Sequence, residues 1–133
     1  MLPVARHEAR ERALSLLYEA EAKQSPPAQV LAELPVPPDA FAADLVQGVG
    51  VNLERIDALI DEHAIGWALD RMPAIDRAVL RMATYELMAR DDVPTAVVLS
   101  EAVELAAGYS TDESGRFVNG VLASVAAELR PEA

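Results

Sequence analysis

The chain has 133 residues and a formal net charge of −11, because its 22 acidic residues outnumber 11 basic ones. This length predicts a single domain, residues 1–133, or two small halves that share one core. The absence of cysteine excludes disulfides, thiolate nucleophiles and cysteine-ligated metal sites. The acidic balance argues against attraction of nucleic acid or anionic membranes to the whole surface, so any RNA contact needs a local basic patch.

Helical periodicity and proline positions predict the first half of the chain. Apolar residues at a 3.6-residue period indicate a helix over residues 6–23. Five prolines between positions 26 and 38 leave room only for a short helix at about 27–34. A third helix is expected to restart near Asp39, where the glycines at 48 and 50 weaken or bend it. The stretch "NLERIDALIDEHAIGWAL" is typical of a fourth helix, with Asn52 as its N-cap.

The second half is expected to contain three further helices. Pro73 suits the first turn of a helix whose residues are apolar almost all round, which is typical of the buried centre of a bundle. A sixth helix is predicted from about 95 to 107. Ser110 and Glu113 form a capping-box pattern for the last helix, which runs to Arg130 before a proline. No run shows strand alternation, so the expected fold is all-α.

Nothing in the sequence indicates an enzyme. There is no G-x-S-x-G, no H-E-x-x-H and no glycine-rich phosphate loop. Asp57 and Asp61 lie one helical turn apart with His63 nearby, but His63 points about 120° from the face of Asp57. We interpret these residues as a solvated helix face and expect no metal and no cofactor. No apolar run of about 20 residues could span a membrane, and we expect a cytoplasmic protein.

The first helix gathers three arginines within seven positions. Arg12 lies on the outer face one turn after Glu8, so the two are expected to form an ion pair. Arg6 and Arg10 instead extend the core-facing stripe past its end. There they either bind a ligand such as phosphate, which suits the planar guanidinium, or cover the edge of the core.

Aromatic residues offer two further candidates. Tyr18 lies at the edge of the stripe of the first helix. Phe117 points about 85° from the apolar stripe of the last helix, next to Arg116. Aromatic side chains beside an arginine stack on bases, although a Phe that covers the edge of the core is the alternative. Gly120 is predicted to allow the close approach of another helix.

One carboxylate of the central helix stands among apolar residues. Glu86 needs a partner there, because a buried charge without one is costly. Arg90, four residues later, is the nearest candidate, and a capping role at a neighbouring helix end is another.

Five segments in order resemble one family, the bacterial transcription antitermination factor NusB. They are "RERALSLLY", "FAADLVQGV", "IDRAVLRMATYELMARDDVP", "SEAVELA" and "GRFVNGVL". The match spans nearly the whole chain except residues about 24 to 38. The resemblance implies a compact bundle of about seven helices in two three-to-four-helix halves. The same fold forms the first domain of ribosomal RNA cytosine methyltransferases, and we expect no catalytic domain here.

The resemblance also implies a function and its residues. Such proteins pair with NusE, a protein of the small ribosomal subunit, bind boxA RNA in ribosomal RNA leader transcripts, and help RNA polymerase in its antitermination complex to read through terminators. The residues that match RNA-binding positions are Arg6, Arg10, Tyr18, Arg116 and Phe117. Asp76 and Glu113 match positions that face NusE.

The chain departs from this pattern at His7 and Glu8, which interrupt the basic run. An acidic residue within the patch weakens phosphate attraction, so we expect weak RNA binding by the chain alone, strengthened by the partner protein. The net charge and Glu8 also support an alternative hypothesis, a homodimeric protein–protein adaptor with little or no RNA binding.

Overall fold

The computed structural model describes residues 5–132, and within that range the chain forms seven α-helices and no strand. They are α1 (Arg6–Ala22), α2 (Pro27–Ala32), α3 (Ala40–Val51), α4 (Leu53–His63), α5 (Ala74–Ala89), α6 (Thr95–Tyr109) and α7 (Asp112–Leu129), with a 3-10 turn, η1, at Leu69–Arg71. The predicted all-α fold is confirmed. The fourth helix is shorter than predicted, because the chain leaves it at His63 and turns at Gly66, whose φ is +84°.

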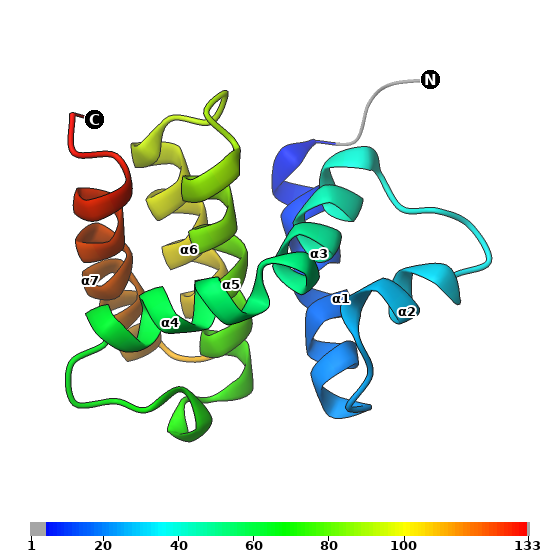
Figure 1. Cartoon of the computed structure of the whole chain (residues 1–133), viewed down its shortest axis with the longest axis horizontal. Coiled ribbons are helices and arrows are strands. Elements are labelled where there is room, and N and C mark those ends of the chain that lie inside the picture. Colours follow the sequence, from blue (N-terminus) through cyan, green and yellow to red (C-terminus); the bar gives the residue numbers. More distant parts are fainter. Residues whose placement is uncertain (1–4, 133) are drawn as a thin grey trace.

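The helices form two groups that share the central helix α5 (Figure 1). One group holds α1, α2 and α3, and the other holds α5, α6 and α7, with α4 packed on α5 and α7. α5 also packs on α1 and α3, and ten of its 16 residues are buried. A single apolar core runs through both groups. The prediction that this helix forms the buried centre of the bundle is therefore confirmed.

Glycines permit close helix contacts, but not where the sequence predicted one. A Cβ on Gly48 of α3 would lie 2.1 Å from the ring of Tyr85, so only glycine lets α3 pack on this side chain of α5. Gly115 packs against Val103 and Ala107 of α6, where a Cβ would still find ordinary contact distances. A Cβ on Gly120 would meet no atom of the described residues within 4 Å, so the predicted role of this glycine in helix packing is wrong.

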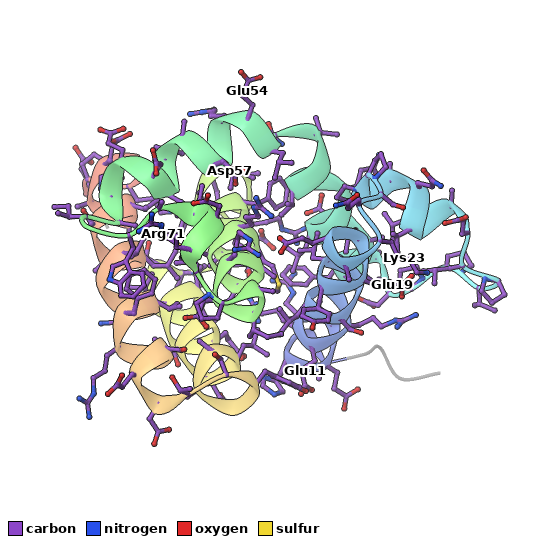
Figure 2. All side chains as sticks on the ribbon, turned by 90° about the horizontal axis from the view of Figure 1, so that it is seen from below. Glu11, Glu19, Lys23, Glu54, Asp57 and Arg71 are labelled. Atoms are coloured by element: carbon purple, nitrogen blue, oxygen red, sulfur yellow. The ribbon has the colours of Figure 1, made fainter. Side chains whose placement is uncertain are left out.

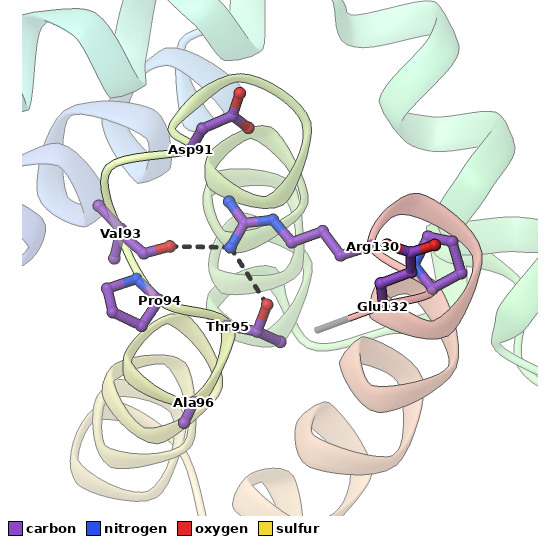
Figure 3. Close-up of a pocket in the computed structure, with 8 residues that line it drawn as sticks. Asp91, Val93, Pro94, Thr95, Ala96, Arg130 and Glu132 are labelled. Atoms are coloured by element: carbon purple, nitrogen blue, oxygen red, sulfur yellow. Dashed lines mark hydrogen bonds between the residues drawn. The ribbon is translucent and has the colours of Figure 1, made fainter.

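Two helix ends are closed differently from the sequence pattern. Thr111, not Ser110, is the N-cap of α7, and its hydroxyl accepts a hydrogen bond from the backbone N–H of Ser114 at 3.0 Å. At the end of α5, the guanidinium of Arg130 donates to the carbonyls of Glu86, Leu87 and Arg90. Figure 3 shows the same group reaching the carbonyl of Val93 and the hydroxyl of Thr95. Arg130 thus ties the end of α7 to the loop between α5 and α6.

Charged side chains cover the outside of the bundle (Figure 2). Glu54 projects from the outer side of α4, while Glu19 of α1 pairs with Lys23 at 2.9 Å. Arg81 of α5 forms a two-bonded pair with Asp57 of α4, at 2.8 and 2.9 Å. Among residues 5–132, no helix is both long enough and apolar enough to cross a membrane.

Candidate functional site

Arg10 is buried, contrary to the expectation that it lies at an open edge of the core. Only 2% of the residue is exposed, and its guanidinium donates to both carboxylate oxygens of Glu86, at 2.8 and 2.9 Å. The predicted Glu86–Arg90 pair is therefore wrong, because α1 brings Arg10 closer to this carboxylate than a residue on the same helix. In this arrangement Arg10 stabilises the junction of α1 and α5 and does not face solvent.

Three guanidinium groups surround one phenyl ring at this end of the molecule. The central carbons of Arg6, Arg10 and Arg90 lie 4.6, 5.1 and 4.8 Å from the ring centroid of Phe41. Phe41 opens α3 and is 7% exposed, so its ring forms a fixed wall between α1 and the end of α5. Cations at such distances are attracted to the face of an aromatic ring. We call Arg6, Arg10, Arg90 and Phe41 the arginine cluster.

Carboxylates neutralise the exposed part of the arginine cluster. Asp92, in the loop after α5, accepts from Arg6 at 3.1 Å and from two nitrogens of Arg90 at 3.0 Å each. Asp44 of α3 accepts from Arg90 at 3.2 Å and from the hydroxyl of Tyr85 at 2.8 Å. Hydrogen bonds from Arg90, and secondarily from Arg6, lower the pKa of Asp92, so this carboxylate stays charged at neutral pH.

The interruption of the basic run also has a structural consequence. The ring of His7 bonds Glu101 of α6 at 2.8 Å and lies 3.7 Å from Glu11. The bond to Glu101 raises the pKa of His7 above its usual value. Among the described residues, no ion pair joins Glu8 to Arg12, so the predicted pair is not formed. Both Glu8 and Arg12 are exposed on the outer face of α1.

A cleft of about 270 Å³ lies where α5 and α7 begin. This volume suits one long side chain rather than a larger molecule, since pockets for drug-sized ligands start at roughly 300 Å³. Trp67 and Phe117 form an edge-to-face pair in its wall, with ring centroids 5.9 Å apart. We call this cleft the aromatic pocket; its lining includes Trp67, Met72, Pro73, Asp76, Glu113 and Phe117.

The aromatic pocket contains a buried carboxylate without a partner. Asp76 is 3% exposed, and its Oδ1 atom has no hydrogen-bond partner among the described residues. Glu113, the other acidic residue of the lining, is exposed at the start of α7. A buried polar atom without a partner is costly and rare in folded proteins. The arrangement is therefore suited to receive a donor, and a positively charged one above all, from a binding partner.

Neighbouring residues hold the wall of the aromatic pocket in place. Gly66 adopts its positive φ just before Trp67, which brings the tryptophan back toward α7. Arg77 of α5 donates to the carbonyls of Leu69 and Met72, at 2.8 and 2.7 Å. The same guanidinium pairs with Glu21 of α1, which lowers the pKa of that carboxyl. Arg77 thus fixes the loop that carries Trp67 to both groups of helices.

The structure separates the predicted site residues into two sets. Arg6 lies at the start of α1, next to the end of α5, whereas Phe117 lines the aromatic pocket at the start of α5. The 16 residues of α5 place these ends roughly 24 Å apart at 1.5 Å per residue. Tyr18, 47% exposed, lies twelve residues along α1 from Arg6. Arg116 is exposed beside Phe117, and no ion pair involves it within residues 5–132.

Sequence reasoning missed four residues of these sites: Phe41, Arg90, Asp92 and Trp67. Trp67 carried a usable signal, because it is the only tryptophan of the sequence and follows a glycine. Phe41 and Asp92 carried none, since their role depends on helices that are distant in sequence. Among the described residues, two groups of donors lie close enough to hold a metal: His7 with Glu101 and Glu104, and His63 with Glu62 and Glu128. In each group the histidine already bonds a glutamate.

Comparison with known proteins gives consistent matches along the chain. The model of the NusB family matches residues 7–127. The transcription antitermination protein NusB of Salinispora arenicola is 50% identical over 92% of this chain and 95% of its own length. That of Saccharopolyspora erythraea is 51% identical over 92% of this chain and 86% of its own.

Solved structures agree with this result. A NusB structure from T. maritima superposes with a TM-score of 0.86 at 34% identity, covering 96% of this chain and 94% of that one. A chain from a crystal structure of the antitermination factors NusB and NusE in complex with double-stranded RNA superposes with a TM-score of 0.78 at 28% identity. That match covers 92% of this chain and 96% of the other.

Proposed function

The chain belongs to the NusB family, and on that basis we propose that it is a transcription antitermination factor that binds boxA-type RNA together with NusE. Two relatives that are 50% and 51% identical to this chain are named transcription antitermination proteins, and the chain matches 95% and 86% of their lengths. One of its structural neighbours comes from an assembly of NusB and NusE with RNA. The complex acts on RNA polymerase in the cytoplasm, and no catalytic step is assigned to the chain.

The observation that carries this proposal is the aromatic pocket. Its buried Asp76 lacks a partner, and Glu113 stands beside it, as expected for a surface that meets a basic protein. We assign Asp76 and Glu113 to the contact with NusE. Phe117 forms part of the wall of the pocket, and its neighbour in the sequence, Arg116, is exposed. We therefore assign these two residues to the border between the NusE contact and the RNA contact.

RNA contact is assigned to the residues that reach solvent. Arg6 has a 48% exposed side chain, and Tyr18 and Arg116 are exposed as well. Guanidinium groups pair with phosphates, while aromatic rings stack on the bases of single strands. Arg10 contributes indirectly, because its buried pair with Glu86 fixes the helix from which Arg6 projects.

Binding of boxA-type RNA, measured by fluorescence anisotropy with NusE titrated in, tests the proposal. Arg116→Ala is expected to weaken the complex about tenfold and to lower the salt slope by about 0.7, the value for one phosphate contact of a single strand. Arg55→Ala is the matched control, because Arg55 is an exposed arginine on α4, and it removes the same charge. Equal losses in the two variants would show that only net charge matters and would contradict a local contact.

The alternative hypothesis from the sequence is a homodimeric protein–protein adaptor with little or no RNA binding. Sedimentation equilibrium of the free chain, followed by the same RNA titration, separates the two roles. The proposed factor binds boxA-type RNA in the presence of NusE, whatever its mass alone. A stable dimer that binds no RNA even with NusE would overturn the proposal.

A further inference from the structure

One carboxylate makes the contacts of a bound phosphate at the exposed edge of the arginine cluster. Asp92 takes a two-bonded contact from Arg90, with Nε to Oδ1 and Nη2 to Oδ2 at 3.0 Å, and a third bond from Arg6 at 3.1 Å. Guanidinium groups bind carboxylate and phosphate through the same parallel pair of N–H bonds. The site is therefore already shaped for an oxyanion.

We propose that Arg6 and Arg90 form a phosphate-binding site for single-stranded RNA, and that Asp92 occupies this site in the free protein. The inference rests on the proposed RNA-binding function and adds to it a residue, Arg90, and a competing internal ligand. RNA binding then exchanges one anion for another: the Asp92 carboxylate turns away and a backbone phosphate takes its donors.

The geometry explains why Arg90 and Arg6 serve this site while Arg10 does not. The side chain of Arg10 is 3% exposed and Glu86 holds its guanidinium, whereas those of Arg6 and Arg90 are 48% and 25% exposed. The ring of Phe41 lies 4.6 and 4.8 Å from the two exposed groups. This wall limits the orientations of both guanidinium groups, so an incoming phosphate meets donors that are already oriented.

The carboxylate is also able to leave. The side chain of Asp92 is 50% exposed, and ion pairs that open to water are weak. Asp44 keeps its bond to Arg90 at 3.2 Å when Asp92 turns away, so Arg90 stays in place. Asp92 therefore lowers the affinity for RNA by a modest factor and does not abolish binding.

The decisive experiment compares two neighbouring carboxylates. Asp92→Asn and Asp91→Asn each remove one negative charge, but Asp91 makes no bond to either arginine within the described chain. Affinity for boxA-type RNA in the presence of NusE is measured by fluorescence anisotropy at two salt concentrations. Asp92→Asn is expected to raise the affinity roughly two- to fivefold above that of Asp91→Asn, the range that an exposed ion pair of up to about 1 kcal/mol corresponds to.

A second pair of variants tests the arginine itself. Arg90→Gln is expected to weaken RNA binding about tenfold relative to Arg55→Gln, with thermal melting used to verify that the variants are folded. If Arg90→Gln fails to fold, Arg90→Lys keeps the charge but loses the two-bonded contact, and we expect it to weaken binding at least threefold.

The outcomes separate the two claims. Binding by the unmodified chain with identical responses of Asp92→Asn and Asp91→Asn would overturn the phosphate site while leaving the RNA-binding function in place. Absence of RNA binding by every variant and by the unmodified chain would overturn the proposed function and this site together.

Discussion

The two ends of α5 differ in whether their charged side chains have partners within the chain. At its carboxyl end, Glu86, Arg90 and Asp92 all have partners within the chain, and Arg130 donates to the last carbonyls of the helix. At its amino end, Asp76 is buried like Glu86 but has an oxygen without a partner among the described residues. The charged groups at the first end are paired within the chain, whereas the second end leaves one carboxylate oxygen without a donor among the described residues.

This difference teaches how each end responds to a ligand. An anion that binds at the carboxyl end must displace Asp92, so binding there is an exchange. A donor that binds at the amino end satisfies an atom that folding left unsatisfied, so binding there adds a bond without breaking one. Substitutions at the carboxyl end should therefore change stability most, and substitutions at the amino end should change partner affinity most.

The largest effect is expected from Glu86→Ala. Removing this carboxylate leaves the guanidinium of Arg10 buried without its two-bonded partner, which typically costs about 3–5 kcal/mol of unfolding free energy. Urea denaturation followed by circular dichroism measures the loss. The double variant Arg10→Met with Glu86→Leu should recover most of it, because neither residue then carries a charge. A loss below about 1 kcal/mol in the single variant would contradict the structural role assigned to this pair.

Arg130→Met should produce the next largest effect. The substitution removes the donor of the Leu87 and Val93 carbonyls, at an expected cost of about 2–4 kcal/mol. The carbonyls of Glu86 and Arg90 also lose a bond from Arg130, but each still accepts from a backbone N–H. Thermal and urea unfolding measure it. Arg12→Met is the control, since Arg12 forms no ion pair among the described residues, and its effect should stay within about 0.5 kcal/mol.

Asp76→Asn should reverse the pattern at the other end of α5. We expect the unfolding free energy to change by less than about 1 kcal/mol, because the lost carboxylate had an unsatisfied oxygen. Affinity for NusE should fall about thirtyfold, the factor that about 2 kcal/mol corresponds to when a buried charge loses its partner. Calorimetric titration measures the affinity. Full affinity with normal stability would exclude Asp76 from the interface.

The smallest effect concerns His7, on the surface next to the arginine cluster. Its pKa is raised above the unfolded value of 6.5, mainly by the bond to Glu101, so its contribution to stability is complete below pH 6.5 and fades as pH rises through the folded pKa. NMR titration of the His7 ring should give a pKa above 6.5. Glu101→Gln should lower that pKa more than Glu104→Gln does. Equal shifts would mean that the pKa of His7 responds to the total negative charge of α6 and not to the bond with Glu101.

The sequence predicted which residues around α5 face the core, but it did not predict which charged residues pair with each other. Helical angles correctly placed Arg10 on the core-facing stripe of α1, and the apolar circumference of α5 correctly predicted its burial. The same reasoning chose Arg90 for Glu86 because it considers neighbours on one helix. The true partner lies 76 residues away on α1. Spacing along a helix carries no information on a residue that tertiary packing brings opposite.

The sequence by itself determined the helices, their order and the family, because periodicity, prolines and motif order are local properties that do not depend on how helices pack. Only the tertiary structure decided which charges are available. It buried Arg10 against Glu86, placed Asp92 between Arg6 and Arg90, and left Asp76 in the pocket of Trp67 and Phe117 with an oxygen unpaired among the described residues. The reason is physical: the cost of a charge depends on its burial and on the groups that face it, and both are set by contacts between distant segments.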